Sequence, residues 1–525
     1  MKPYRGLLHG VLVFSIAGVI SKVLSAGYRI PLQNIAGDQG LYIYQQVYPF
    51  LSLAWLLSIY GFPAAISSLI AKQINSNDSS AQGLYTAVFL YLYAFGGALF
   101  FILYSSSEHL ARWMGDPELA EPLRMASYVY LAFPLTSLFR GIQQASYHMS
   151  AAAWSQILEQ FVRVSGIMFA TVMFLEKRSL YELGAGAAFA STVAALTAAL
   201  FLLWKSREVF TSVNVSRKIF TNVFQYLNVW KTLLVTGFVF SLNYMILLLF
   251  QLVDVFTMIP ALQEYGLTLE EAKKEKGVFD RGQPLVQFGI VFGSSLSLAM
   301  IPVFQNKRTE VVTDDIKSVF KLTFLFSFGA AAGLITIFPA VNVLLYKTNE
   351  GTGALQLFSL LIFLLSLTMS LSVILQKFGY VKRQIIWFFG AMVAKGILNI
   401  WLIPVAGITG AALASVVSTA VLLWIFLVIL KQHVSISIVK IIPWRKAGFA
   451  LLMMIAVVYG ITSGAVNLFT IEERIEFLWV VLTSCMTGAL LYLGLLLKLN
   501  TFTEEELREV PYRDKIFRIL GVKSR

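Results

Sequence analysis

Long apolar runs recur from one end of the chain to the other, and they constrain its fold more than any other feature. A transmembrane helix needs about 20 mostly apolar residues, and about fourteen stretches of the chain meet that requirement. They are approximately 10–33, 42–71, 84–105, 123–146, 153–175, 181–204, 231–259, 282–304, 318–345, 354–377, 384–403, 407–430, 444–466 and 476–498. The sequence therefore predicts an all-α polytopic membrane protein. Pro49, Gly61 and Pro63 predict a bend in the second span.

Composition supports the membrane class. Of the 525 residues, 58% are hydrophobic and 13% are charged, whereas soluble chains are about 45–50% apolar and about 25% charged. The single cysteine, Cys485, lies in an apolar run, so no internal disulfide is expected. The first apolar run has no small-residue cleavage site, which predicts an uncleaved first helix rather than a signal peptide.

The formal net charge of +13 would suit a nucleic-acid-binding protein, but the distribution of the basic residues argues against one. With the N-terminus placed inside the cell, about 26 Lys and Arg fall in inner segments and about 10 in outer segments. This asymmetry is the topology signal of bacterial membrane proteins. It predicts a multi-pass protein of the bacterial plasma membrane with both termini in the cytoplasm and no nucleic-acid partner.

The longest outer loop runs from about residue 261 to residue 284. Thr268 and Glu271 have the spacing of a capping box, and Gly277 is a plausible stop, so a short surface helix is expected there. No loop is long enough to fold as a separate catalytic domain.

A weak internal repeat predicts two lobes. The segment GAGAAFAST at 184–192 resembles GITGAALAS at 407–415, about 224 positions later. Small residues at such places also serve helix packing, so packing alone is an alternative explanation. We expect an N-lobe at 1–215 with six helices, a C-lobe at 216–432 with six helices, two extra helices at 433–500 and a basic cytoplasmic tail at 501–525.

Polar residues form stripes along the helices of the predicted N-lobe. The stripes are Arg140, Gln143, Gln144 and Tyr147 in 123–146, and Gln156, Glu159, Gln160 and Arg163 in 153–175. Each has the i, i+3, i+4, i+7 spacing of one helix face. In the first span, Lys22 and Arg29 are seven residues apart and share a face. A charge at the bilayer centre costs at least about 2.5 kcal/mol, so the stripes should face protein or water.

Two interpretations of these charges are open. Arg29 and Arg140 lie near the ends of their spans, where long side chains can extend to the membrane surface, and Glu159 and Arg163 can pair within one helix. Taken together, however, Lys22 and the three arginines outnumber the single glutamate. This excess favours a water-filled cavity that binds an anion.

The deep polar residues of the predicted C-lobe differ in type from those of the N-lobe. Asp254, Asn399 and Ser415 together with a main-chain carbonyl could form a small oxygen site for a cation, with Lys395 one turn from Asn399. The ammonium of Lys395 could instead fill that site as a fixed counter-ion, and an ordinary interhelical ion pair is an equally open interpretation.

Several motifs resemble the polysaccharide-transporter and SpoVB-like branch of the MOP flippase superfamily. They are FRGIQQA and SQILEQFVRV, SKVLSAGYRIPLQNIAG, YGFPAAISSLIAK, FDRGQPLVQFG and the tail segment LREVPYRDKIFRIL. The resemblance covers nearly the whole chain. It implies fourteen helices in two lobes around a central cavity, and export of undecaprenyl-pyrophosphate-linked sugars.

The related MurJ-like branch suggests particular residues. Lys22 and Arg29 resemble its cationic pair in the first helix, and Asp280 and Arg281 match the Asp-Arg pair that opens its eighth helix. Its second-helix arginine has no counterpart here. Asp254, Asn399 and Ser415 resemble ligands of its sodium site, with Lys395 in place of a neutral ligand.

The predicted function is therefore a flippase, not an enzyme, that moves a polyprenyl-pyrophosphate-linked saccharide, such as lipid II or a spore-wall precursor, across the bilayer by alternating access. No cofactor is expected, Na⁺ or H⁺ is a candidate coupling ion, and a monomer is expected. One alternative is a cation-coupled drug antiporter of the same superfamily, which should have an acidic cavity. Another is a membrane glycan polymerase or ligase, for which the outer loops offer only scattered acids such as Asp116, Glu118 and Glu121.

Overall fold

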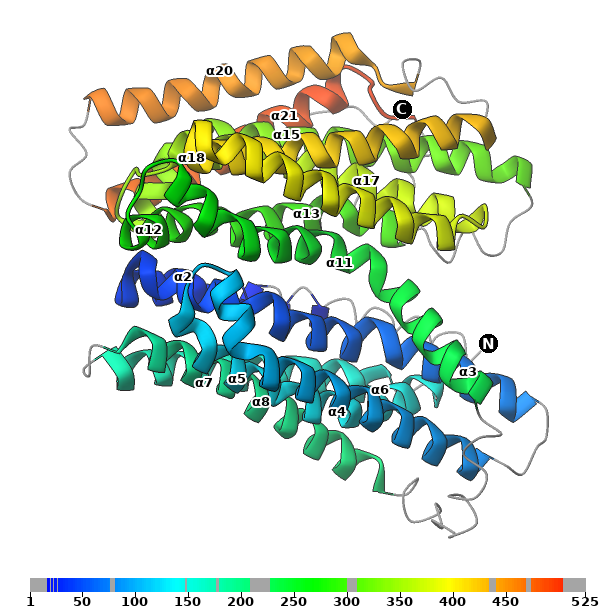
Figure 1. Ribbon diagram of the computed structural model, residues 1–525. Coiled ribbons are helices and arrows are strands. Elements are labelled where there is room, and N and C mark those ends of the chain that lie inside the picture. Colours follow the sequence, from blue (N-terminus) through cyan, green and yellow to red (C-terminus); the bar gives the residue numbers. More distant parts are fainter. Residues whose placement is uncertain are drawn as a thin grey trace. The chain divides into compact units, whose positions relative to one another are not determined.

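A computed structural model describes residues 27–75, 81–146, 149–175, 179–207, 227–299, 309–433, 441–468 and 474–503, with a few positions between 17 and 25. Helices account for nearly all of these residues, and the described ranges contain no strand (Figure 1). The all-α prediction is confirmed. Within these ranges, ten helices are long and apolar enough to cross a membrane, so the protein is multi-pass, while the count of about fourteen stays a prediction.

The chain divides into two compact units, Met1–Asp280 and Arg281–Arg525. The helices of the N-terminal unit are α2 (Arg29–Leu56), η1 (Leu57–Gly61), α3 (Phe62–Asn75), α4 (Ala81–Trp113), η2 (Pro117–Leu119), α5 (Ala120–Ser127), α6 (Val129–Ala145), α7 (Met149–Leu175), α8 (Leu180–Lys205), α11 (Leu227–Glu264) and α12 (Leu269–Asp280). Those of the C-terminal unit are α13 (Gly282–Ala299), α15 (Thr309–Tyr346), α16 (Thr352–Ser359), α17 (Leu361–Lys377), α18 (Val381–His433), α20 (Trp444–Leu468) and α21 (Glu476–Lys498). The predicted lobe boundary at 215/216 lies outside the described residues and stays a prediction.

Two very long helical segments each contain a break. Gly37 in α2 has φ 73° and ψ −176°, and Gly407 in α18 has φ 56° and ψ −139°. A positive φ is accessible to glycine at little cost. Gly37 falls between the first and second predicted spans, and Gly407 falls where the twelfth begins. Each helical segment therefore changes direction between two predicted spans.

The expected bend in the second span is a π-helical turn, η1. Pro63, two residues beyond it, has no N–H to donate, so the regular α-helical hydrogen bonding is interrupted there. The turn also lies against α11, because a Cβ atom on Gly61 would come within 2.6 Å of the Gly237 carbonyl oxygen. The irregular turn therefore lies where α2 and α3 meet α11.

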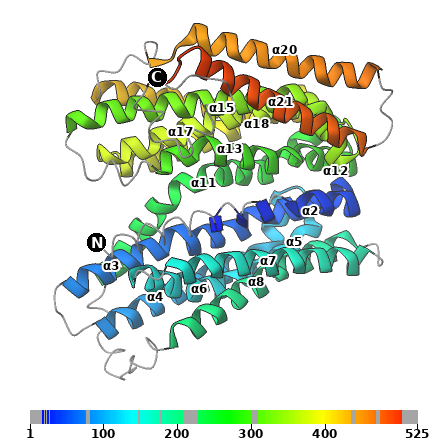
Figure 2. The ribbon, with the colours of Figure 1, turned by 180° about the vertical axis from the view of Figure 1, so that it is seen from behind.

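Within the N-terminal unit, α7 lies along α8, as Figures 1 and 2 both show, and α3 packs on α6. The first copy of the repeat lies in α8, where a Cβ on Gly186 would meet the Ala170 side chain of α7 at 3.1 Å. In the second copy, a Cβ on Gly410 would meet the Leu402 carbonyl oxygen at 2.2 Å. Both copies thus lie at close approaches to the preceding helical segment, as the packing explanation expects.

The outer-loop helix is α12. Its predicted capping box is confirmed, because the Thr268 N–H and hydroxyl donate to Glu271 Oε2 at 2.9 and 2.8 Å, and the Glu271 N–H donates back to the Thr268 hydroxyl. The predicted stop at Gly277 is wrong, since α12 continues to Asp280. Gly277 instead lets α12 approach α2, because a Cβ there would lie 2.1 Å from the Asp38 carbonyl oxygen.

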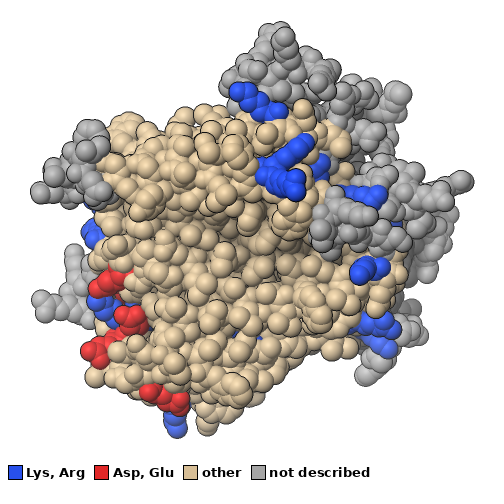
Figure 3. All heavy atoms as spheres, turned by 90° about the horizontal axis from the view of Figure 1, so that it is seen from above, with Lys and Arg blue, Asp and Glu red and all other residues tan. Residues whose placement is uncertain are grey.

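Charged side chains are unevenly spread over the face drawn in Figure 3. Asp and Glu gather near one edge together with some Lys and Arg, more Lys and Arg lie toward the opposite side, and a broad surface between them shows almost no charge.

Candidate functional site

The polar stripe of α7 is buried inside the N-terminal unit. Gln156, Glu159 and Gln160 are each 1% exposed, and Arg163 is 8% exposed. The predicted stripe therefore faces protein rather than lipid, as the cost of a charge in hydrocarbon requires.

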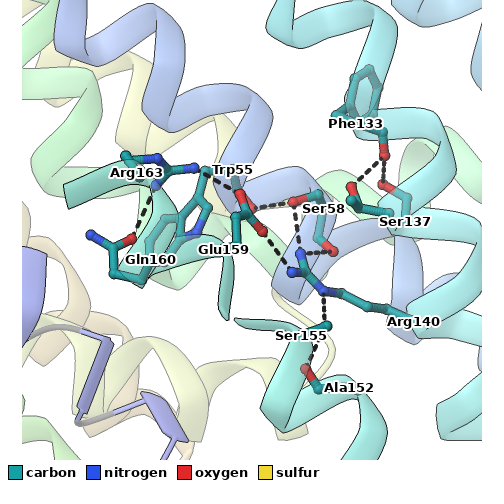
Figure 4. A network of polar contacts seen from close by, with 11 residues as sticks. Trp55, Ser58, Phe133, Ser137, Arg140, Ala152, Ser155, Glu159, Gln160 and Arg163 are labelled. Atoms are coloured by element: carbon teal, nitrogen blue, oxygen red, sulfur yellow. Dashed lines mark hydrogen bonds and ion pairs between the residues drawn. The ribbon is translucent and has the colours of Figure 1, made fainter. Parts of the chain in front are cut away.

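Glu159 is shared between two arginines on two helices (Figure 4). Its Oε2 accepts from Arg140 Nη2 of α6 at 2.6 Å, and its Oε1 accepts from Arg163 Nη2 of α7 at 2.7 Å. The intrahelical pair of Glu159 and Arg163 considered from the sequence is thus present, but Arg140 shares the same carboxylate. Two cations and one anion leave this cluster with a net positive charge.

Arg140 is bonded on all sides by protein groups. Its Nε donates to Ser155 Oγ of α7 at 3.0 Å, and its Nη1 donates to the backbone oxygen and the Oγ of Ser58 in the π turn at 3.3 and 3.2 Å. The side chain is fully buried, so its guanidinium does not extend to the membrane surface. Arg140 therefore ties α6 to α7 and to the turn between α2 and α3.

Arg163 is less completely bonded. Its Nη1 donates to Gln160 Oε1 at 3.1 Å, and its Cζ lies 5.8 Å from the Trp55 ring centroid. Among the described residues, Arg163 Nε, both amide atoms of Gln156 and Gln160 Nε2 are buried without a hydrogen-bond partner in the chain. Buried polar atoms are normally paired, so this face of α7 carries unused hydrogen-bonding capacity beside a cation.

Arg29, the first residue of α2, is fully buried against tyrosines. Its Cζ lies 4.2 Å from the centroid of the Tyr48 ring, and the hydroxyls of Tyr28 and Tyr44 are hydrogen-bonded at 2.7 Å. Arg29 thus lies inside the unit instead of extending to the surface. Arg29 and Arg163 each lie beside an aromatic ring of α2, Tyr48 for Arg29 and Trp55 for Arg163.

The other predicted residues of the N-terminal unit vary in their surroundings. Gln143 Nε2 donates to Ser206 Oγ at the end of α8 at 2.8 Å, and Gln144 is half-buried. Asp280 is buried and accepts from Lys276 Nζ at 2.6 Å through both oxygens. Lys22 lies outside the described residues.

Arg281 begins the C-terminal unit and is fully buried there. Its Nη1 donates to Thr348 Oγ1 at 2.7 Å, and its Cζ lies 5.4 Å from the Tyr346 ring centroid. The Asp-Arg pair thus has one residue in each unit, and each has partners in its own unit.

The residues of the predicted cation site are divided between the two units, and each unit is described by itself. Asp254 is a buried residue of α11, while Lys395, Asn399 and Ser415 are buried in α18. The Ser415 hydroxyl donates to the Ala411 carbonyl at 3.0 Å, which leaves its oxygen lone pairs free to accept. Whether an ion binds at this set stays a prediction.

Sequence reasoning missed several partners. Ser155 lies one turn before Glu159 on α7, and this i, i+4 spacing could have revealed it. Ser58 and Tyr48 carry no comparable signal. Ser58 meets Arg140 from 82 positions away, and Tyr48 meets Arg29 from outside the i, i+3, i+4 range of one helix turn. Lys276 could have been found from its i, i+4 spacing to Asp280.

Comparison with known proteins places this architecture in a family. Residues 7–307, more than half of the chain, match the family model described as polysaccharide biosynthesis protein. The chain belongs to this family. It is 36% identical to the Bacillus subtilis membrane protein YabM over 521 residues, which is 97% of this chain and 96% of YabM.

Two further relatives from Bacillus subtilis are more distant. The chain is 24% identical to stage V sporulation protein B, with 96% and 97% of the two chains covered, and 24% identical to the lipid II flippase MurJ, with 87% of each covered.

Solved structures share the fold. The chain is similar to lipid II flippase MurJ in an inward closed conformation, with a TM-score of 0.70, 15% identity and coverage of 92% of this chain and 98% of that one. It is also similar to an inward-facing multidrug resistance MATE transporter of the MOP superfamily, with a TM-score of 0.62, 16% identity and coverage of 81% and 98%. The predicted resemblance to SpoVB-like and MurJ-like proteins is confirmed by these relatives, and the fold matches that of MATE transporters of the MOP superfamily. The protein is a multi-pass membrane protein of this family. The activities named for its relative MurJ and for the MATE structures are those of a flippase and of transporters, not of enzymes.

Proposed function

We propose that this protein moves a polyprenyl-pyrophosphate-linked saccharide from the inner to the outer leaflet of a bacterial plasma membrane. The observation that carries the proposal is the presence of two buried arginines in the N-terminal unit, Arg29 on the Tyr48 ring and Arg163 beside unpaired amide groups of α7. Arginine binds phosphate groups through two parallel hydrogen bonds. Amides and tyrosine hydroxyls can bind the hydroxyls of a saccharide.

Charge supports an anionic substrate. Arg140 already satisfies one oxygen of Glu159, so the remaining oxygen only partly neutralises Arg163. A diphosphate would be attracted by the resulting positive potential, and low-dielectric surroundings strengthen that attraction. Arg140 is occupied by protein groups, so in this proposal it positions Glu159 and the π turn rather than binding substrate.

The relatives support a lipid-linked substrate. The relative MurJ is named a lipid II flippase. A lipid-linked saccharide with a pyrophosphate carries the phosphate groups that arginine side chains bind. The polyprenyl chain would stay in lipid while the polar head crosses by alternating access. In a negative-inside cell, each negative charge that moves outward gains about 2.3 kcal/mol per 100 mV. We further propose a monomer with both termini in the cytoplasm.

A cation-coupled drug antiporter is a second candidate, because the fold is also that of a MATE transporter. The deep acids Asp254 and Asp280 would then bind a cationic drug or the coupling ion. Asp280 is paired with Lys276, and the α6–α7 cluster is positive. We therefore favour the anionic substrate.

Reconstituted vesicles test the proposal. A labelled lipid-linked saccharide is placed in both leaflets, and the head groups accessible to an impermeant reagent are followed over time. The unmodified protein should expose nearly all of them, Arg163→Ala should abolish flipping, and Arg163→Lys should retain a small part of it. Arg112→Ala, at an exposed arginine of α4, is the matched control. Flipping at the unmodified rate by Arg163→Ala would overturn the assignment of the site.

A further inference from the structure

A second polar site lies in the N-terminal unit, apart from the buried residues Arg29, Arg140, Glu159 and Arg163, which are called here the arginine cluster. It is a cavity of about 380 Å³, called here the Lys273 pocket. Its lining residues are Gln39, Tyr42, Ile43, Glu118, Ser179, Leu180, Tyr181, Glu270 and Lys273. They come from α2, η2, the start of α8 and α12, which all lie within one compact unit.

The inner wall of the pocket is fixed by a buried carboxylate. Asp116 is 1% exposed, and its Oδ2 accepts from Tyr42 Oη at 3.0 Å and from Tyr181 Oη at 2.7 Å. Lys273 Nζ lies 3.7 Å from the same oxygen and is itself 4% exposed. These contacts tie four segments of the chain to one carboxylate, so the pocket walls are held in place by the protein itself.

The rim of the pocket is more accessible. Glu270 binds Lys273 Nζ at 2.9 Å and accepts from Gln39 Nε2 at 2.8 Å, while Glu118 is exposed. The ring of Tyr181 is half-buried, and Lys273 Nζ lies 5.5 Å from its centroid. A ligand would therefore meet an aromatic ring, an amide, a serine hydroxyl and carboxylate oxygens.

The charges decide which ligand fits. Asp116 and Glu270 already neutralise the ammonium of Lys273, and Glu118 adds a further carboxylate to the lining. Such a pocket repels a diphosphate. Its volume is in the lower part of the roughly 300–1,000 Å³ range of small-molecule sites, and its mixture of one aromatic ring with several hydrogen-bonding groups suits a neutral polyol.

We infer that the Lys273 pocket binds a sugar unit of the transported saccharide, an inference that rests on the proposed function. The arginine cluster would hold the diphosphate, and this separate site would hold part of the glycan while repelling the diphosphate. Carboxylate, amide and hydroxyl groups would bind sugar hydroxyls, and the apolar face of the sugar ring would pack on Tyr181.

Cysteine protection tests the inference on the full-length protein. Cys485 is the single cysteine, so Cys485→Ser provides a cysteine-free background. In that background, Ser179→Cys and, separately, the exposed position Glu118→Cys are reacted with a maleimide in the presence of an N-acetylglucosamine disaccharide or of inorganic pyrophosphate. Glu121→Cys is the matched control, because this exposed glutamate of α5 does not line the pocket.

The disaccharide should slow labelling at positions 179 and 118 several-fold and leave position 121 unchanged, while pyrophosphate should protect none of them. Adding Glu118→Ala to Ser179→Cys should raise about tenfold the disaccharide concentration that half-protects position 179, because a hydrogen bond to a charged group is lost. Equal labelling with and without disaccharide at both positions, or protection by pyrophosphate, would overturn the inference.

Flipping of lipid-linked saccharide by the cysteine-free protein is measured in parallel. If the protein flips the lipid-linked saccharide but the disaccharide does not slow labelling, the sugar site at the Lys273 pocket is rejected and the proposed transport function stands. Protection without flipping would support the sugar site and reject the proposed transport function.

Discussion

The Nη1 of Arg140 donates to the backbone oxygen of Ser58 at 3.3 Å, 82 positions away in sequence. Ser58 lies in the π turn, where the helix does not follow the regular α pattern of backbone bonding. A buried guanidinium thus stabilises an irregular turn and at the same time holds Glu159. The bend between α2 and α3 is therefore coupled to the charge cluster on α6 and α7.

Because Arg140 and Arg163 share the Glu159 carboxylate, neutralising Glu159 should destabilise the protein more than neutralising Arg140. Glu159→Gln leaves Arg140 and Arg163 buried without a counter-ion, and breaking a buried pair costs about 3–5 kcal/mol. Arg140→Gln leaves Glu159 paired with Arg163 and loses mainly hydrogen bonds, at about 1–3 kcal/mol. Thermal melting of both variants in detergent should show the larger fall for Glu159→Gln. A larger fall for Arg140→Gln would contradict this charge balance.

The close approach of α12 to α2 predicts a strong effect at Gly277. Gly277→Ala would place a Cβ 2.1 Å from the Asp38 carbonyl oxygen, and overpacking of this kind costs about 1–3 kcal/mol. Hydrogen exchange of the α12 amides should accelerate in this variant. Gly353→Ala is the control, since a Cβ at that glycine meets nothing within 4 Å. Unchanged exchange in Gly277→Ala would show that α12 does not depend on this contact.

The capping box of α12 predicts a pH dependence. Hydrogen bonds from the Thr268 N–H and hydroxyl lower the pKa of the Glu271 carboxyl below its usual value of 4.5. Because the folded pKa is the lower one, the stabilisation is fully present above the unfolded pKa and is lost as the pH falls through the folded pKa. Exchange of α12 amides, corrected for the intrinsic rate, should be constant from about pH 7 to 5 and rise below the usual Glu range. Glu271→Gln should remove this rise; if the rise persists, another group is responsible.

The sequence predicted much of the fold because its signals are local. Apolar runs of helix length gave the helical class, and the i, i+3, i+4, i+7 spacing placed Glu159 and Arg163 on one buried face. Local spacing cannot tell whether a buried arginine binds a ligand or a backbone oxygen, and Arg140 differs from Arg163 in this respect. The Lys273 pocket was not predicted, because its walls come from four segments that only the tertiary structure brings together.

The proposed orientation predicts which positions a membrane-impermeant maleimide reaches in intact cells. In the Cys485→Ser background, Lys274→Cys in α12 should be labelled from outside, and Lys431→Cys near the end of α18 should be labelled only after the cells are opened. Both lysines are exposed, so the reagent can reach either once it is on the correct side. The reverse pattern would reject the orientation with cytoplasmic termini.

The coupling ion is the subject of the last prediction. Lys395 is buried in α18 one turn before the buried Asn399. A fixed ammonium beside the predicted oxygen ligands disfavours a second cation there, because like charges repel most strongly in a poorly solvated site. Flipping should therefore respond to membrane potential and change little when sodium is replaced by potassium at fixed potential. Lys395→Asn should either make flipping depend on sodium or abolish it, whereas Lys377→Asn, near the end of α17, should leave both responses unchanged. A steep sodium requirement in the unmodified protein would show that the Lys395 ammonium does not take the place of the ion.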